Sequence, residues 1–353
     1  MRIAVLTNAY PPPMNGGVAR IASMQVQMLE AAGEDVRVWH PEVPWFAASP
    51  FKRLRCHLAD LFARNDLAQE ILAWKPDVLI THNLTGCGFG TPHAIQRHGV
   101  RWMHLLHDVQ LFEPSGQVRD ARAITPWQQA WALLRSIAFG KPDLLISPTL
   151  WLYQQHRRRG FFWRTPHVIM PNPGPAPKRI DRKPHQPLRL LYVGRIAKDK
   201  GSDILYYLAM QTTSLFDLEI IGDGPDLPLF EKLSHKIRLS GQRTSEEVME
   251  AMESADVLLV PSHLAENQPT VILEAASRGL PVIATEKAGI KETLNTPHQY
   301  GTDRRSDVWL MLIRDLTHPE AYAKASEHMR QIAERHDPEA YAHQFLSLLK
   351  SNL

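Results

Sequence analysis

The sequence predicts an α/β protein of two doubly wound parallel domains that face a central cleft. Short apolar runs alternate with longer amphipathic stretches, which is typical of strand–helix units in a parallel sheet. The rhythm breaks once, at a proline-rich segment, and then restarts. The 353 residues suffice for two domains of ordinary size. Ligands of such sheets bind outside the carboxyl ends of the strands, so we expect the site in the cleft.

The first half predicts six strands and, over 19–32, a helix. The helix is expected to end at Gly33, because glycine is favoured just past a helix C-terminus. The strands are continuous apolar runs, as expected where helices cover both faces of a sheet. They are expected at 3–6, 36–39, 78–81, 102–106, 144–147 and 168–170.

The break carries four prolines between positions 171 and 177, with Pro184 and Pro187 after it. Proline disfavours helix and strand alike, so this segment predicts a linker. Further strands are expected at 188–193, 218–221, 237–239, 257–260 and 282–284, and a last helix over 338–349. We therefore predict an N-terminal domain (1–175), a linker (176–187), a C-terminal domain (188–335) and a final helical segment (336–353).

The net charge of +3 is unevenly distributed. Residues 1–180 hold 20 Lys and Arg against 12 Asp and Glu, a net charge of +8, and residues 181–353 hold 20 against 25, a net charge of −5. A basic half attracts anionic lipids, membranes or nucleic acid, although a chance imbalance explains it equally well. The basic and aromatic segment 157–164 leaves the same choices open: an anionic membrane surface or lipid-linked acceptor, or a structural helix end. Nucleic acid is the least favoured partner. The basic residues at 52–55 give weak additional support to a membrane surface.

The low cysteine content predicts that the protein works in a reducing compartment. Its two cysteines are too few for a disulfide framework. Its apolar runs are too short to span a bilayer, and its first residues predict a strand instead of a signal peptide. We expect it in the cytoplasm or peripherally on the cytoplasmic face of a membrane.

The most informative segment runs from 265 to 284. A strand is expected to end at Pro261, a loop to hold Glu266, and a helix to start near Pro269, because proline is favoured at the first helical position. Free backbone N–H groups at a helix start bind phosphate. Carboxylates repel phosphate, so Glu266 and Glu274 should accept hydrogen bonds from sugar and ribose hydroxyls.

Two further turns favour a diphosphate ligand. Arg195 and Lys200 follow the strand at 188–193, between Gly194 and Gly201, which allow a close approach. Gly222 lies in a Gly-Asp-Gly-Pro turn after the next strand, a weaker signal because any tight turn has this composition.

In this order the segments resemble the signature of glycosyltransferase family 4, retaining enzymes with the GT-B fold of two Rossmann-like domains. The resemblance covers most of 188–290: Val-Gly-Arg…Lys-Gly, Gly-Asp-Gly-Pro, Ala-Asp-Val…Pro-Ser and Glu-x7-Glu. The first half is similar more loosely, through Gly16-Gly17, His107-Asp108 and Pro171-Asn172. Pro173 stands where the family has glycine.

The resemblance implies that the first domain binds the acceptor and the second binds the donor, and that the final helical segment packs back on the first domain. It also implies a role for each matching residue. Arg195 and Lys200 bind the donor diphosphate, Glu274 the ribose and Glu266 the sugar, while His107 lines the active site beside the sugar. The implied catalytic residues are His107, Glu266, Arg195 and Lys200. The implied donor-binding residues are Gly16, Gly17, Arg195, Lys200, Gly222, Arg243, Glu266, Asn267, Gln268, Pro269, Thr270, Val271 and Glu274.

The implied reaction moves a sugar from a UDP- or GDP-linked donor to a glycan with retention at the anomeric carbon. A lipid-linked glycan of cell-envelope polysaccharide synthesis is the expected acceptor. Arg195, Lys200 and helix amides would stabilise the departing diphosphate, as metal ions do elsewhere. The chain has no Asp-x-Asp motif, so we expect transfer without a metal and with no cofactor besides the donor substrate.

Other interpretations of these residues stay open. Glu274 could pair with Arg278 on the helix face, Glu266 could lie on the surface, and Asp108 could cap a helix. His82, at the end of another strand, is a weaker candidate than His107. The whole chain could also be a nucleotide-sugar 2-epimerase on the same fold, which would need carboxylates suited to elimination, or a non-catalytic nucleotide-sugar binding module.

Overall fold

The computed structural model describes the chain except residues 12–15, 42–49, 63–65, 114, 117, 119–124, 212–213, 296–300, 303–305 and 352–353. Among the described residues, no helix is long and apolar enough to cross a membrane. The chain forms two compact units: unit 1 consists of Met1–Asn172 and Glu339–Leu353, and unit 2 of Pro173–Pro338. Each unit is built on one parallel six-stranded sheet, so the predicted α/β class with two Rossmann-like domains is confirmed.

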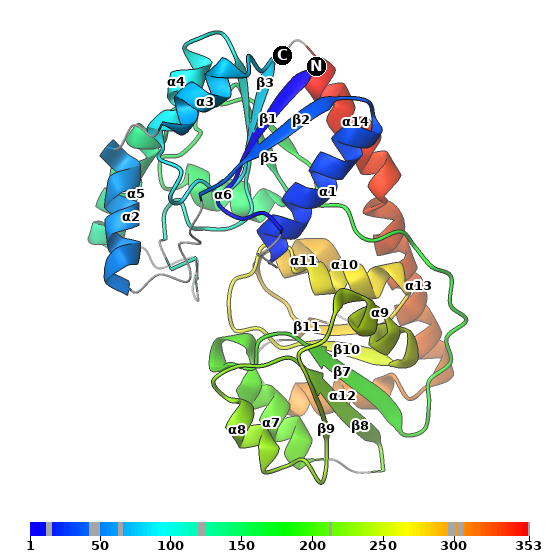
Figure 1. Ribbon diagram of the computed structural model, residues 1–353. Helices are drawn as coiled ribbons and strands as arrows, with labels where there is room; N and C mark the ends of the chain where they lie inside the picture. Colours follow the sequence, from blue (N-terminus) through cyan, green and yellow to red (C-terminus); the bar gives the residue numbers. More distant parts are fainter. Residues whose placement is uncertain are drawn as a thin grey trace. The chain divides into compact units, whose positions relative to one another are not determined.

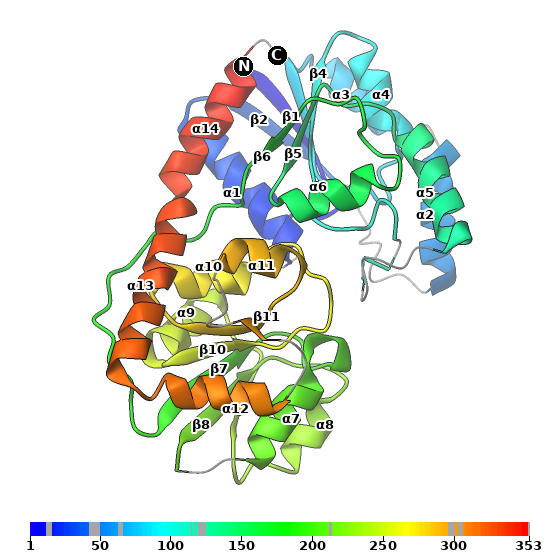
Figure 2. The same ribbon diagram turned by 180° about the vertical axis from the view of Figure 1, so that it is seen from behind.

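Unit 1 has the strand order β2-β1-β3-β4-β5-β6, and its strands are labelled across the two opposite views (Figures 1 and 2). Its strands are β1 (Arg2–Leu6), β2 (Asp35–Trp39), β3 (Val78–Thr81), β4 (Arg101–Leu105), β5 (Leu144–Ser147) and β6 (His167–Ile169). Its helices are α1 (Gly17–Ala31), α2 (Pro50–Phe62), α3 (Leu67–Ala73), α4 (Gly90–Gln96), α5 (Pro126–Phe139), α6 (Leu150–Arg157) and α14 (Pro338–Lys350). One face of the sheet packs against α1 and α14, and the other against α3, α4, α5 and α6.

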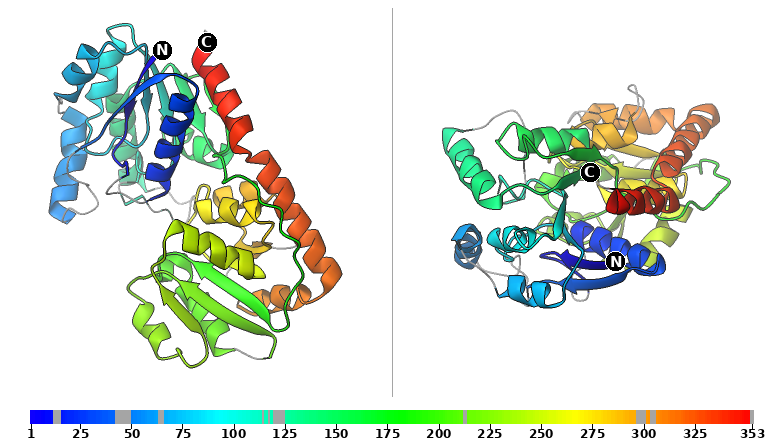
Figure 3. Two further views of the ribbon diagram at one scale, coloured as in Figure 1. Left: turned by 45° about the vertical axis from the view of Figure 1, so that its right-hand side comes forward. Right: turned by 90° about the horizontal axis from the view of Figure 1, so that it is seen from above.

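The last helix, α14, is therefore part of unit 1, although it follows unit 2 in the sequence. Its buried Tyr341, Phe345 and Leu349 pack against strand residues such as Ile3 in β1. Figure 3 shows this helix, in red, beside the strands of unit 1. The phenol of Tyr341 also accepts a hydrogen bond from the Gln25 amide of α1.

Unit 2 has the strand order β12-β11-β10-β7-β8-β9 (Figure 2). Its strands are β7 (Leu188–Val193), β8 (Phe216–Ile221), β9 (Arg238–Gly241), β10 (Val257–Val260), β11 (Val282–Thr285) and β12 (Gly301–Thr302). A 3-10 turn, η2 (Lys198–Lys200), follows β7. The helices are α7 (Ser202–Met210), α8 (Leu227–Glu231), α9 (Ser245–Ser254), α10 (Thr270–Ser277), α11 (Ala288–Leu294), α12 (Ser306–Asp315) and α13 (Pro319–Arg335).

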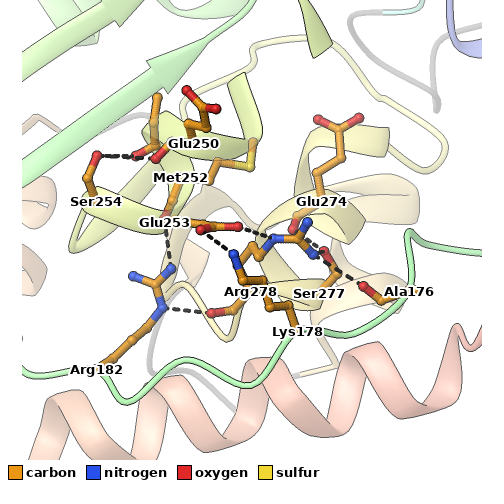
Figure 4. A network of polar contacts seen from close by, with 11 residues as sticks. Ala176, Lys178, Arg182, Glu250, Met252, Glu253, Ser254, Glu274, Ser277 and Arg278 are labelled. Carbon is orange, nitrogen blue, oxygen red and sulfur yellow. Dashed lines mark hydrogen bonds and ion pairs between the residues drawn. The ribbon is translucent and has the colours of Figure 1, made fainter. Parts of the chain in front are cut away.

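The proline-rich segment after β6 contains neither helix nor strand up to β7. Arg182 fastens it to unit 2, because its guanidinium donates hydrogen bonds of 2.7 Å to the carbonyls of Met252, Ala255 and Arg278 (Figure 4). These carbonyls lie at the C-terminal ends of α9 and α10, where backbone acceptors lack helical partners. Lys178 adds an ion pair with Glu253 at 2.6 Å.

Candidate functional site

In unit 2, the chain reverses its direction across the sheet at β7. It runs from β7 outward to β8 and β9, and then returns to the other side of β7 with β10. Ligands of open α/β sheets bind at this switch point, outside the carboxyl ends of the two central strands. The loops that leave β7 (194–201) and β10 (261–269) meet there, and the amide of His263 donates a 3.0 Å hydrogen bond to the carbonyl of Asp199.

Two glycines allow neighbouring loops to approach this edge. A Cβ atom at Gly222 would lie 2.0 Å from the carbonyl oxygen of Gly194, and the φ of Gly222 is +141°. A Cβ atom at Gly289, in α11, would lie 1.5 Å from the carbonyl oxygen of Asn267. The Gly289 amide also donates a 3.0 Å hydrogen bond to the Glu266 carbonyl. Gly222 therefore serves loop packing, and Gly289, which the sequence prediction missed, positions the Glu266 loop.

The predicted residues Lys200 and Glu266 meet at this edge. The ammonium nitrogen of Lys200 lies 3.1 Å from Oε1 of Glu266, and both side chains are partly exposed. Arg195 forms an ion pair with Asp199, four residues further on in the same turn. The carbonyl of Arg195 accepts a 2.8 Å hydrogen bond from the phenol of Tyr192, which braces the turn. Asp199 and Tyr192 were missed, although the i,i+4 spacing of Arg195 and Asp199 is a readable signal.

Helix α10 begins at Thr270 with Pro269 as its N-cap, in agreement with the predicted helix start near Pro269. Glu274 lies in the second turn and is 5% exposed. Its carboxylate points away from Arg278 (Figure 4). Arg278 instead pairs with Glu253, at 3.1 Å, and donates to the Ala176 carbonyl. Arg278 therefore has Glu253 as its ion-pair partner, instead of Glu274 as the sequence alternative suggested.

The other predicted donor residues occupy several loops. Buried Gln268 donates a 3.5 Å hydrogen bond to the Thr293 hydroxyl of α11. Arg243 is exposed after the edge strand β9 and pairs with Glu247, which belongs to the capping box of α9. Gly16 and Gly17, in unit 1, are exposed at the start of α1, with Gly16 as the N-cap. Thr270 and Val271 open α10.

In unit 1, two predicted histidines meet at the carboxyl ends of β3 and β4. Nδ1 of His82 lies 2.7 Å from Nε2 of His107, and the rings stack. Burial lowers the pKa of His107 to about 4 and also lowers the pKa of His82 and His104. Both imidazoles are therefore neutral at pH 7, and one donates a hydrogen bond to the other.

Asp108, next to His107, organises a turn. Its carboxylate accepts hydrogen bonds from the Gln110 amide at 2.8 Å and from the Asn83 amide group at 2.7 Å. Residues 108–112 form a bend and turn, so the interpretation of Asp108 as a helix cap is wrong. Burial raises the pKa of Asp108, and these two hydrogen bonds lower it. The histidine pair is thus held by the two loops that Asp108 and Asn83 connect.

The chain matches two families of known proteins. Residues 2–173 match the family described as "Glycosyl transferase 4-like domain" and residues 187–351 the family described as "Glycosyl transferases group 1". Over 327 residues, 85% of this chain and 83% of the relative, it is 26% identical to the GDP-mannose-dependent alpha-mannosyltransferase of Mycobacterium tuberculosis. It is 23% identical, over 69% of this chain and 67% of the relative, to an uncharacterized 42.6 kDa protein in the cps region of Klebsiella pneumoniae.

Solved structures share the fold across the whole chain. The Anabaena HepE protein in complex with UDP and glucose gives a TM-score of 0.69 at 16% identity, covering 99% of both chains. Sucrose-phosphate synthase from Thermosynechococcus elongatus gives 0.72 at 17% identity, covering 99% of this chain and 98% of that one. Together, the two family matches span nearly all of the chain, and each unit is built on one parallel six-stranded sheet, so the chain is a glycosyltransferase of the GT-B type.

Proposed function

We propose that the protein is a retaining hexosyltransferase of glycosyltransferase family 4 that uses a UDP- or GDP-linked sugar. Its acceptor is a lipid-linked glycan of cell-envelope polysaccharide synthesis, at the cytoplasmic face of the membrane. The observation that carries the proposal is the meeting of the Arg195–Lys200 turn with Glu266 at the switch point of unit 2, beside the start of α10. The relatives add a polysaccharide context, since one is named for a cps region.

The proposed chemistry follows from the charges at this edge. Asp199 and Glu266 hold Arg195 and Lys200 in place, and a donor diphosphate would exchange for these carboxylates as the partner of both cations. As the bond from the anomeric carbon to the diphosphate oxygen breaks, negative charge grows on that oxygen. The two cations and the amides at the start of α10 stabilise it. Glu266, released from Lys200, accepts hydrogen bonds from the sugar, and Glu274 from the ribose.

In this proposal the neutral imidazole of His107 contacts the transferred sugar. Transfer needs no metal ion, because Arg195 and Lys200 supply the positive charge that a metal supplies in other glycosyltransferases. Full activity is expected in excess chelator. A loss of activity that manganese restores would overturn the metal-independent mechanism.

A thermal-shift panel of nucleotide sugars tests the donor site. A ligand that binds only the folded protein stabilises it by about 2.7 kcal/mol at a hundred times its Kd, so the correct donor stands out. Glu274→Ala should abolish most of this shift. Glu253→Gln, which breaks the pair with Arg278 on the neighbouring helix, is the matched control and should keep it. An unchanged donor shift in Glu274→Ala would place the ribose contact elsewhere. Donor incubated without acceptor should hydrolyse slowly; an epimerised nucleotide sugar would overturn the transferase assignment.

A further inference from the structure

Helix α5 of unit 1 turns apolar side chains to solvent. All of its exposed residues are apolar: Pro126, Trp127, Ala130, Leu133, Leu134 and Ile137. Trp127 is 78% exposed and Ile137 73%. An ordinary surface helix faces solvent with polar residues and the core with apolar ones. A contiguous apolar face of this kind marks an interaction site.

The buried side of α5 carries the only charged residue of this helix, Arg135. The guanidinium of Arg135 is fully buried and lies 3.1 Å from Nδ1 of His57 in α2. It also lies 4.8 Å from the ring centroid of Phe89. Burial lowers the pKa of Arg135 to about 10, and the negative charge of Asp60 in α2 partly offsets this lowering. These contacts attach α5 to α2, and rotation of the helix would separate Arg135 from its partners in α2. In this orientation the residues of α5 that face solvent are the apolar ones.

Two neighbouring segments extend this face. Helix α2 lies beside α5 in both ribbon views (Figures 1 and 2), and exposes Phe51, Arg55 and Leu58 on one side, at helical spacing. The turn after α6 also touches α5, because the backbone at Gly160 lies against Leu133 and Ser136. Trp163 in this turn is 62% exposed. We call the exposed residues of α2, α5 and 157–164 the α2–α5 surface.

Every exposed charge described on this surface is positive. The charges are those of Arg55, Arg157, Arg158 and Arg164, and Arg164 stacks over the ring of Trp163 at 4.1 Å. Of the acidic groups nearby, Asp60 is buried, and Glu113, partly buried, accepts a 3.3 Å hydrogen bond from Gln128 of α5. The side chains of residues 52–54 lie outside the described part of the chain. Tryptophan, aliphatic residues and arginines without exposed acids match the boundary of an anionic bilayer.

The segment 157–164 thus combines two of the interpretations that its sequence left open. Phe161 and Phe162 are buried in the core of unit 1, and Arg159 is buried over the ring of Phe112 at 4.0 Å. Arg157, Arg158, Trp163 and Arg164 remain at the surface. We infer that the α2–α5 surface docks the protein on an anionic lipid bilayer, with Trp127 and Ile137 at the acyl boundary and the arginines among the phosphates. This extends the proposed function, since a lipid-linked acceptor is met at a bilayer.

Vesicle sedimentation of the full chain tests the docking. The wild type should sediment with vesicles of phosphatidylcholine and phosphatidylglycerol in equal parts, and far less with phosphatidylcholine alone. The double variant Trp127→Gln/Ile137→Gln should bind the anionic vesicles about tenfold or more weakly, because both side chains contribute apolar area. The matched control is Leu229→Gln/Met311→Gln, two exposed apolar residues of unit 2, and should bind like the wild type. Arg158→Gln/Arg164→Gln should weaken binding mainly at low salt.

Three outcomes would overturn the inference: wild-type protein that ignores anionic vesicles, a Trp127→Gln/Ile137→Gln variant that binds as well as the control, or light scattering in which that variant merely converts a dimer to a monomer. The donor thermal shift, measured on the same proteins, separates this inference from the proposed function. A wild type that binds no anionic vesicles but keeps its donor shift counts against the docking alone. Vesicle binding without any donor shift counts against the transferase alone.

Discussion

At the scale of single residues, the histidine pair makes the folded protein sensitive to acid. Burial lowers the pKa of His107 from 6.5 to about 4. Between pH 6.5 and pH 4, His107 is therefore protonated in the unfolded chain and neutral in the native state. The free energy of unfolding should therefore fall as the pH drops from about 6.5 to about 4, by at most about 3 kcal/mol for this group. His107→Gln should flatten the fall in melting temperature over this range. His343→Gln, an exposed change in α14, should leave it as in the wild type; equal slopes in all three proteins would contradict the shifted pKa.

Individual site residues differ in how far the sequence reveals them. The sequence motif is enough to predict that Lys200 and Glu266 lie close together, because both follow strands whose carboxyl ends meet at one edge of the sheet. The contact of His82 with His107 depends on β3 and β4 being neighbours, which chain order suggests but spacing does not fix. Gly289 carries no signal of its own, since its importance lies in a carbonyl group 22 residues earlier in the sequence.

At the scale of elements, the site depends on loops that fit together without side chains between them. Gly289→Ala would place a methyl group where the Asn267 carbonyl lies, so α11 or the Glu266 loop must move. Overpacking of this kind costs about 1–3 kcal/mol, and the displaced loop should also lose donor binding. Gly174→Ala is the matched control, since its Cβ would make ordinary contacts at 3.5 Å or more. Calorimetric titration with the donor from the thermal-shift panel measures the donor affinity of both variants. Unchanged donor affinity in Gly289→Ala would show that the loop tolerates the shift.

The elements themselves were predictable where apolar runs are long. Strand β9 lies at 238–241 instead of the expected 237–239, because Ile237 is buried before the strand and the ladder continues to Gly241 through an irregularity opposite Ile221. The two-residue strand β12 and the five-residue helix α8 escaped prediction, since neither is long enough to have a periodic pattern.

At the scale of the whole molecule, the amphipathic pattern of α14 shows that it buries one face, and the final segment was predicted to pack back on the first domain. The structure assigns it to unit 1 through Tyr341, Phe345 and Leu349. Phe345→Ala, at a fully buried site, should cost about 3–5 kcal/mol of stability. The loss should be confined to unit 1: hydrogen exchange should accelerate in β1, β3 and α1, whose residues share the Phe345 cluster, and stay unchanged in β7 and β10. Gln344→Ala, the exposed neighbour, should change neither. Faster exchange in β7 and β10 of the Phe345→Ala protein would mean that the two units unfold together. If the faster exchange is confined to unit 1, then unit 1 opens while unit 2, with the proposed donor site, stays folded.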